Sequence, residues 1–285
     1  MKSPPFAYTR PTTRAAALAV LESEPDARPL AGGQSLLPLM GARLAAPAVL
    51  VDLERVEGLS GIQLDGGTVR IGAMTRQADA EASELLATRC PVFVEGLRQV
   101  GYPAIRNRGT IGGSLAHADP AAELPVLAVA LDASMLIDGP AGPRTVAARD
   151  FFRGPFEPDL HPGELLTAVE LPANELTWAF HELARRSADF ALVSVAVGLR
   201  IEDEVCREAR VVVGAAHPRP IRLQEGEEAL VGARIDRQLA EEVATRAVAA
   251  LRPAGDVQGS SGYRRQVAAV LLRRAIVHAA GRSRK

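Results

Sequence analysis

The sequence predicts an α+β protein, and three observations support this class. Stretches with apolar residues at helical spacing alternate along the chain with short runs that have the period-2 pattern of strands. Several of these runs are joined by Gly- and Pro-rich turns, as in antiparallel hairpins. The 285 residues suffice for one large domain or two to three ordinary ones. We expect an N-terminal domain over residues 1–175, with subdomains at about 1–58 and 59–175, and a smaller C-terminal α/β domain with an antiparallel sheet over residues 176–285.

The first subdomain is predicted to be a small β–α–β-like unit. Thr12 or Thr13 can cap its helix, and Pro25 helps to end it. The two predicted strands cover residues 28–31 and 49–53.

The second subdomain begins with a hairpin over residues 64–71, because two adjacent glycines separate two extended runs. Helices are predicted to start near Thr75 and at Pro91. A further helix over residues 120–131 is expected to have Asp119 as its N-cap and Pro120 at its first position.

The C-terminal domain is predicted to start after a boundary near residues 172–177. Alternating apolar residues over 193–201 predict a half-buried strand, and residues 210–214 predict its antiparallel neighbour. Two helices are expected to close the chain, one from Asp236 and one over about residues 263–280.

Composition excludes several classes of protein. The formal net charge is −1, with 33 basic and 34 acidic residues, so nothing favours nucleic-acid binding. No stretch approaches the about 18 apolar residues of a membrane span, and no secretory leader is recognisable, so we expect a cytoplasmic protein. Cys90 and Cys206 are far apart, whereas an iron–sulfur cluster normally needs four thiolates, so no cluster or metal site is expected.

Two short segments share one plan, a Gly-Gly step flanked by hydroxyl or amide side chains. The first glycine motif is Ala31-Gly32-Gly33-Gln34-Ser35, and the second is Thr110-Ile111-Gly112-Gly113-Ser114. Glycine permits positive φ and a close backbone approach, so that consecutive N–H groups can converge on an anion. Two such motifs suit the two phosphates of a dinucleotide, although a Gly-Gly pair more often marks a simple turn.

The residues around the motifs carry a family likeness. The strings are QSLLP at 34–38, IRNRGTIGGSLAHADPAAELP at 105–125, RRSADFA at 185–191 and GAAHPRP at 214–220. Over essentially the whole chain the sequence resembles the FAD-binding medium subunit of the molybdenum hydroxylases, a family that includes carbon monoxide dehydrogenase and xanthine dehydrogenase. The resemblance implies an FAD-binding domain of the PCMH type over residues 1–175.

The resemblance also implies which residues contact FAD. The first motif would wrap the pyrophosphate with N–H groups, and the second would form the opposite wall near the diphosphate and ribityl chain. The implied set is Leu30, Ala31, Gly32, Gly33, Gln34, Ser35, Leu36, Val100, Gly101, Thr110, Ile111, Gly112, Gly113, Ser114, His117, Glu123, Leu165 and Leu166.

Several of these residues have a plain structural alternative. Glu123 matches an acidic position, usually Asp, that bonds hydroxyls of the cofactor, but it also suits a solvated charge on the first turn of a helix. His117 is flavin-proximal by the resemblance, whereas a lone His is more often structural. Leu165 and Leu166 match residues that pack on the isoalloxazine, and a buried strand explains them equally well. Relatives carry a lysine at or next to His181, where this chain has His-Glu.

The segment between the motifs allows two interpretations as well. Val100 and Gly101 match positions that approach the flavin, but they also suit a helix core residue and a C′ glycine. The Arg106-Asn107-Arg108 run is expected to fix the loop or to face a partner subunit.

Missing motifs support a cofactor-based function. The chain has no GxGxxG after a strand, no GxxxxGK[ST] and no HExxH, and no persuasive nucleophile with its base. In a flavoprotein the cofactor does the redox chemistry, while the polypeptide supplies position and electrostatics.

The resemblance implies an FAD-binding electron-transfer subunit. Electrons would come from two [2Fe–2S] clusters in a small subunit, supplied by a molybdenum cofactor in a large subunit, and would leave to an external acceptor. A heterotrimer, commonly paired into a dimer of trimers, is implied. The alternatives are a stand-alone FAD oxidase of the vanillyl-alcohol oxidase type and a flavin-free scaffold subunit.

Overall fold

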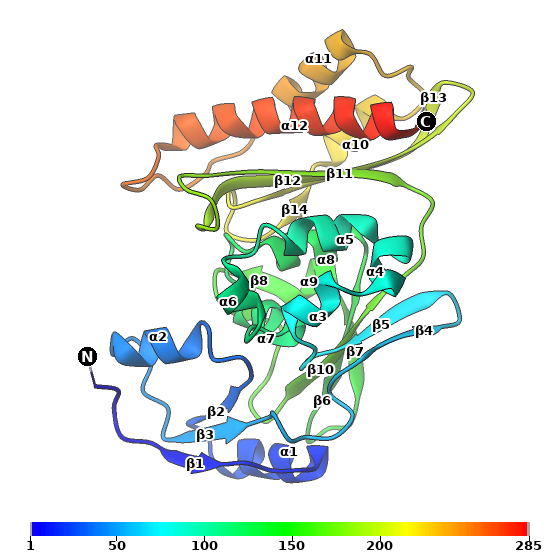
Figure 1. The fold of residues 1–285 in the computed structure, drawn as a ribbon. Helices are drawn as coiled ribbons and strands as arrows, with labels where there is room; N and C mark the ends of the chain where they lie inside the picture. Colours follow the sequence, from blue (N-terminus) through cyan, green and yellow to red (C-terminus); the bar gives the residue numbers. More distant parts are fainter. Residues whose placement is uncertain (1, 284–285) are drawn as a thin grey trace.

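The computed structural model describes residues 2–283, and its N-terminal lobe (residues 7–53) is built on a parallel three-stranded sheet of order β1-β3-β2 (Figure 1). The Thr13 side chain caps α1 by accepting from the Ala16 N–H at 3.2 Å. The predicted β–α–β unit is confirmed, and β1 is an additional strand. The elements are β1 (Ala7–Thr9), α1 (Arg14–Ser23), β2 (Ala27–Leu30), α2 (Leu36–Gly41) and β3 (Val49–Asp52).

The middle part holds a five-stranded antiparallel sheet of order β4-β5-β10-β6-β7, covered by short helices. The predicted hairpin is confirmed: Gly66 and Gly67, both at positive φ, form its two-residue turn. The strands of the five-stranded sheet are β4 (Ile62–Asp65), β5 (Thr68–Gly72), β6 (Ser134–Asp138), β7 (Arg144–Ala147) and β10 (Leu165–Leu171). A separate two-stranded sheet is formed by β8 (Phe152–Gly154) and β9 (Glu157–Pro158). The helices are α3 (Gln77–Glu81), α4 (Glu84–Arg89), α5 (Pro91–Leu97), α6 (Pro103–Arg106), α7 (Ile111–His117), α8 (Glu123–Ala130) and α9 (Ala148–Phe151).

Helix α8 starts later than the sequence predicts. Asp119 and Pro120 were expected to open it, but the Asp119 carboxylate accepts from the Ala121 N–H at 2.9 Å and closes a turn. The Pro120 carbonyl accepts from the Ala215 N–H of a distant segment. This non-local bond holds the chain out of the helix until Glu123.

The C-terminal part is a four-stranded antiparallel sheet, β11-β12-β13-β14, with helices on both faces (Figure 1). Helix α12 packs along one face, and α5 and α8 pack against the other. The elements are β11 (Thr177–Ala184), β12 (Ala191–Glu202), β13 (Val205–Gly214), β14 (Ile221–Arg222), α10 (Gln224–Leu230), α11 (Arg237–Ala247) and α12 (Ser261–Ser283).

The predicted strand over residues 193–201 is confirmed as part of β12, with β13 as its antiparallel neighbour, but the expectation that it is half-buried is wrong. Residues 191–199 of β12 are all buried. Successive residues of the strand point into two different cores. Val195 and Val197 pack under α11 and α12, while Ala196, between them, joins the core of the middle part. A small residue such as Ala196 reads as neutral in the sequence, so the second buried face was not recognised.

Three apolar cores organise the chain, and two of them cross the predicted boundaries. The N-terminal core includes Met74 and Leu165 from the middle part. The middle core includes Trp178 and Phe180 from β11. The division at about 58 and 175 stays a proposal, and the three parts are packed against one another.

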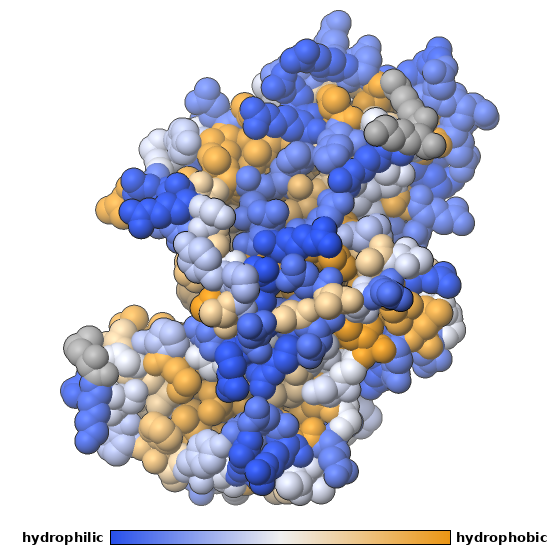
Figure 2. Space-filling view, viewed as in Figure 1, coloured by the Kyte–Doolittle hydropathy of each residue, from blue (hydrophilic) through white to orange (hydrophobic). Residues whose placement is uncertain are grey.

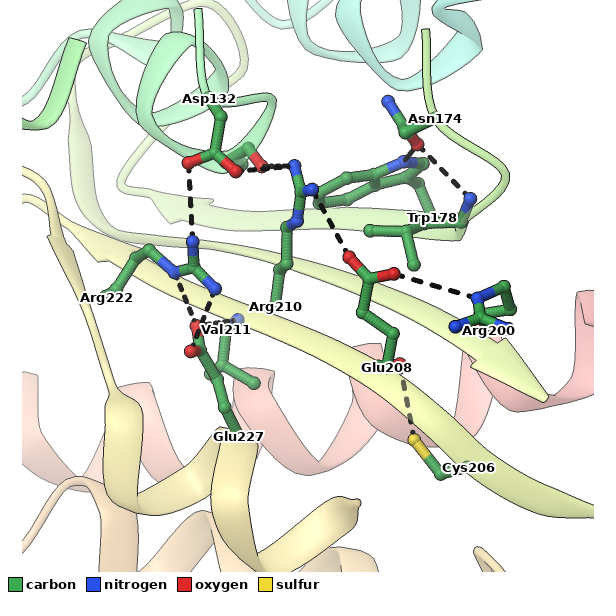
Figure 3. Close-up of polar contacts among 12 residues, drawn as sticks. Asp132, Asn174, Trp178, Arg200, Cys206, Glu208, Arg210, Val211, Arg222 and Glu227 are labelled. Carbon is green, nitrogen blue, oxygen red and sulfur yellow. Dashed lines mark hydrogen bonds and ion pairs between the residues drawn. The ribbon is translucent and has the colours of Figure 1, made fainter. Parts of the chain in front are cut away.

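An ion-pair network joins the end of α8 to the C-terminal sheet (Figure 3). Asp132 pairs with Arg210 at 2.9 Å and with Arg222 at 3.3 Å, and Arg222 also forms a fork with Glu227. In the same view the Trp178 indole donates to Asn174 at 2.8 Å. These contacts fix α8, which carries Glu123 at its other end, against β13 and β14.

Candidate cofactor site

The two glycine motifs, almost 80 residues apart in sequence, meet in the structure. A Cβ placed on Gly32 would lie 2.2 Å from the Arg108 carbonyl oxygen and 2.8 Å from the Gly109 Cα. A Cβ on Gly113 would lie 3.3 Å from the Ala31 Cβ. Backbone therefore packs directly on backbone at this junction, which only glycine permits.

The first motif connects β2 to α2 and has free hydrogen-bond donors. Gly33 has a φ of +74°, which turns the chain, and the Gln34 side-chain amide donates to the Gly32 carbonyl at 3.1 Å. Within the described residues, the backbone N–H groups of positions 32–36 donate to no acceptor. Consecutive unpaired N–H groups are the kind of site that binds an anion.

The second motif is not a loop, as the sequence analysis expects, but the first turn of α7. Thr110 is the N-cap, and its Oγ1 accepts from the Gly113 N–H at 3.0 Å. The Ile111 N–H donates to the Thr75 carbonyl, and the Gly112 N–H donates to the Ala73 carbonyl.

The expectation that N–H groups of the second motif converge on an anion is therefore wrong, because these groups are already bonded within the chain. Gly112 serves packing instead, since its Cβ would lie 2.4 Å from the Ala73 Cβ. Thr110, Ile111 and Gly112 are buried, and Gly113 and Ser114 are half-buried. The role of this segment as a wall of the site stays a prediction.

Glu123 is buried, with only 7% of its surface exposed, so the alternative of a solvated charge is wrong. Burial, together with the nearby Glu182 carboxylate, raises the pKa of Glu123 to about 8. Its carboxyl group accepts a backbone hydrogen bond and has no ion-pair partner among residues 2–283. A buried carboxyl group without a cationic partner is costly unless a ligand donates to it.

The His117 ring packs on the Phe156 ring with centroids 5.0 Å apart, and burial lowers the pKa of His117. The imidazole is therefore the neutral form at neutral pH. Phe156 is at positive φ, and its N–H donates to the Ala118 carbonyl, so backbone contacts hold the ring in place. Cofactor contact by His117 stays a prediction.

Arg106 fixes the segment that the resemblance places near the flavin. Its guanidinium donates to the carbonyls of Val100 and Gly101 at 3.0 and 2.9 Å and to Glu81 at 2.7 Å. The expectation that this basic run fixes the loop is confirmed for Arg106. Gly101 has a φ of +45° but lies beyond the end of α5, so the interpretation as its C′ residue is wrong.

Leu165 and Leu166 lie on β10 and point into different cores. Leu165 packs in the N-terminal core and Leu166 in the middle core. Burial in the two cores explains both residues, and contact with a flavin stays an untested prediction. Leu30 and Leu36, which flank the first motif, are half-buried, and Ser35 is exposed.

The sequence analysis noted the position of Glu182 only as one where relatives carry a lysine, and it missed Ser194. Glu182 Oε2 and Ser194 Oγ are buried without a hydrogen-bond partner in the described chain. The two residues are cross-strand neighbours on β11 and β12. The signal in the sequence was the period of β11, since Glu182 follows Trp178 and Phe180 at intervals of two and shares their face.

The arrangement fits FAD in its chemistry. The first motif presents N–H donors suited to phosphate oxygens, and α8, which follows the second motif in the sequence, carries Glu123, a buried acceptor suited to hydroxyl groups. Figure 2 shows a recess on the left of the molecule, between the N-terminal lobe and the part above it. In Figure 1 the lobe below this recess carries α2, and α6 lies above it.

Other kinds of site are absent from the described part of the chain. Residues 2–283 contain no group of three His, Cys, Asp or Glu side chains placed to hold a metal ion. Cys90 and Cys206 are buried free thiols. No helix over the same residues is both long and apolar enough to cross a bilayer.

Comparison with known proteins identifies the family. The model of the FAD binding domain in molybdopterin dehydrogenase matches residues 4–174, and that of the CO dehydrogenase flavoprotein C-terminal domain matches residues 178–279. The chain is 39% identical over 282 residues to the carbon monoxide dehydrogenase medium chain of Afipia carboxidovorans, covering 98% of each. It is 35% identical to the glyceraldehyde dehydrogenase medium chain of Sulfolobus acidocaldarius, covering 96% of this chain and 98% of that one.

A solved structure gives the same result. A chain of the crystal structure of quinoline 2-oxidoreductase from Pseudomonas putida 86 matches with a TM-score of 0.98 and 41% identity, covering 100% of both chains. The predicted fold class and the resemblance seen in the sequence are confirmed. The chain belongs to the FAD-binding medium subunits of the molybdenum hydroxylase family, and it is a subunit of an oxidoreductase.

Proposed function

We propose that this chain is the electron-transfer subunit of a molybdenum hydroxylase complex, in which it holds FAD between the [2Fe–2S] clusters of a small subunit and an external electron acceptor. A large subunit would carry the molybdenum cofactor, and the three polypeptides would form a heterotrimer that can pair into a dimer. The observation that carries the proposal is the row of unpaired N–H groups at residues 32–36, packed against the second motif.

The chain's own residues would bind and orient the cofactor. We assign the diphosphate to the N–H groups of the first motif and cofactor hydroxyls to Glu123. The second motif would shape the opposite wall through Gly112 and Gly113. Arg106 would hold in place the Val100–Gly101 backbone, which the resemblance puts near the flavin.

FAD, when bound, supplies redox chemistry that accepts electrons one at a time or in pairs. Because electrons would come from a cluster and not from a substrate bound on this chain, no acid–base pair is needed here. The neutral His117 and the buried Glu123 serve position and electrostatics. Because this chain's residues would only bind and orient the cofactor, we favour an electron-transfer subunit over a stand-alone oxidase. The unpaired N–H groups at residues 32–36 support FAD binding over a flavin-free scaffold.

The test is to purify the tagged full-length chain with its bound partners and separate the polypeptides. We expect FAD on this chain, iron and sulfide on a small partner, and molybdenum on a large one. In the complex, a substrate oxidised by the large subunit and added anaerobically should bleach the flavin absorption bands only when the iron–sulfur subunit is present.

Two results would contradict the proposal. Oxidation of a substrate by the chain alone, with its own FAD, would identify a stand-alone oxidase. A chain that binds no FAD, either as purified or after incubation with excess FAD, would identify a scaffold.

A further inference from the structure

Glu54 is connected to the first glycine motif through the parallel sheet of the N-terminal lobe. It follows β3 directly, and the Asp52 carboxylate fixes it by accepting from its N–H at 2.9 Å. The residue between them, Leu53, donates its N–H to the Leu30 carbonyl at 3.0 Å, and Leu30 is the last residue of β2 before the first motif. Glu54 and the first motif are therefore fixed to neighbouring strand ends of one sheet.

Arg76 is connected to the second glycine motif in a similar way. It forms an isolated antiparallel bridge with Thr110. The carbonyl of the residue before it accepts from the Ile111 N–H at 3.0 Å, and the next residue, Gln77, donates its N–H to the Gly109 carbonyl at 2.9 Å. The backbone at Arg76 is therefore bonded to the start of the second motif on both sides.

The Arg76 side chain joins the two motifs across their junction. Its Nη2 donates to the Glu54 carboxylate at 3.2 Å, and its Nη1 donates to the Arg108 carbonyl. The same carbonyl oxygen is the atom that a Cβ on Gly32 would meet at 2.2 Å. The N-terminal lobe thus reaches the peptide before the second motif at two points, directly through Gly32 and through Glu54 by way of Arg76.

Glu54 pairs with three arginines. Arg10 pairs with it from within the N-terminal lobe, whereas Arg76 and Arg108 approach from the other side of the junction, at 3.2 and 4.0 Å. The Glu54 side chain is 40% exposed, and an ion pair at this exposure adds little to the free energy of unfolding. The main effect of these contacts is therefore on how the two motifs are held relative to each other.

We propose that Glu54 and Arg76 form a clasp that holds the two glycine motifs together and so raises the affinity for FAD. The inference rests on the proposed FAD function and extends it to two positioning residues that lie outside both motifs. Neither residue needs to touch the cofactor. With the clasp open, the unpaired N–H groups of the first motif remain, but FAD must itself bring the two parts into place, and this lowers its affinity.

The test is to titrate FAD into the flavin-free full-length chain and its variants at low ionic strength, following flavin fluorescence. Glu54→Gln should weaken FAD binding about fivefold, the size expected for the loss of exposed ion pairs. Charge alone predicts the opposite direction, because removing a carboxylate favours the binding of an anion. Equal or tighter FAD binding by Glu54→Gln would therefore overturn the proposal.

Salt dependence and a double variant give independent readouts. Salt screens exposed ion pairs, so the difference between wild type and Glu54→Gln should shrink to less than about twofold at about 1 M salt. Arg76→Met should weaken FAD binding at least as much as Glu54→Gln. The double variant should bind no more weakly than Arg76→Met alone, because both changes open the same clasp. Additive losses would contradict the clasp.

Glu170→Gln is the matched control. Glu170 pairs with Arg70 at 3.4 Å and at comparable side-chain exposure, but this pair joins β10 to β5 within one sheet. FAD affinity should change less than about twofold in this variant, and both glutamine variants should melt within about 2 °C of wild type without FAD. A much lower melting temperature for Glu54→Gln, with a loss of affinity that salt does not change, would identify a merely structural pair and overturn the proposal.

The failures are distinguishable. If the wild-type chain binds no FAD, the proposed function itself is wrong. If it binds FAD while Glu54→Gln and Arg76→Met bind within twofold of wild type at low ionic strength, only the inference about the clasp is overturned.

Discussion

The two glycine motifs have the same composition and opposite hydrogen-bond states. In the first motif the N–H groups of residues 32–36 have no acceptor in the described chain, whereas in the second the N–H groups of Ile111, Gly112 and Gly113 are all bonded to carbonyls or to Thr110. The first motif follows strand β2. In the second motif, carbonyl groups of the segment over residues 73–75 accept from the N–H groups of Ile111 and Gly112. Both motifs use glycine for close packing, but only the first also leaves N–H donors free for a ligand.

The segments at the two motifs also differ in the polar groups that they carry. The first motif has free N–H donors, whereas α8 and β11, which follow the second motif in the sequence, carry the carboxyl groups of Glu123 and Glu182. A dinucleotide cofactor has phosphates for the donors and hydroxyls for the acceptors. A repeated sequence pattern therefore need not repeat its chemistry.

The largest effect is expected at the contact between the motifs. Gly32→Ala places a Cβ 2.2 Å from the Arg108 carbonyl oxygen, so backbone must move. We expect a loss of about 3 kcal/mol or more in the free energy of unfolding, together with loss of FAD binding. Gly41→Ala in α2 has nothing within 4 Å of the new Cβ and should stabilise by up to about 1 kcal/mol. Equal denaturation midpoints for the two variants would show that the motifs do not pack as described.

The next prediction tests the unpaired N–H groups of the first motif. Gly33 has positive φ, and its Cβ would meet the flexible Leu37 side chain at 2.9 Å. Asn tolerates this backbone conformation, so Gly33→Asn and Gly33→Asp should fold alike. Gly33→Asp should bind FAD about 100-fold more weakly than Gly33→Asn, because its charge opposes the phosphates at low local dielectric. Equal dissociation constants would exclude a phosphate site at the first motif.

Substitutions of Glu123 should lower FAD affinity less than those at Gly33. Glu123→Ala is expected to weaken FAD binding about tenfold, with Glu123→Asp close to wild type. In the flavin-free chain the pKa of Glu123 is raised from 4.5 to about 8, so its contribution to stability is full below the lower value and is lost as pH rises through the higher one. Glu123→Gln should flatten that decline in melts recorded across this range. A decline unchanged in the variant would assign it to other groups.

The smallest effect concerns the second motif. Thr110→Val removes the acceptor that caps the Gly113 N–H and should cost about 1 kcal/mol of stability, while Thr110→Ser should restore it. FAD affinity is expected to change less than about threefold, since the bond is internal to the chain. Unchanged stability with a tenfold loss of affinity would mean that Thr110 or the Gly113 N–H bonds the cofactor directly.

The sequence by itself determined the α+β class, the hairpin at Gly66-Gly67, a cap at Thr12 or Thr13 and one at Asp236, and the family likeness around the two motifs. These features depend on local chemistry: the conformational freedom of glycine, a side chain that accepts from a nearby N–H, and the period of apolar residues.

Only the tertiary structure decided which donors and acceptors remain open. The N–H groups of the second motif are used because residues 73–75 approach from a distant part of the chain, and Glu182 comes near Glu123 because β11 and α8 both pack against β12. The burial of both faces of β12 has the same origin, since α8 and α12 cover its opposite sides. Local patterns state what a residue can bond or bury, but its actual partner depends on segments far away in the sequence, which pack together only in the folded chain.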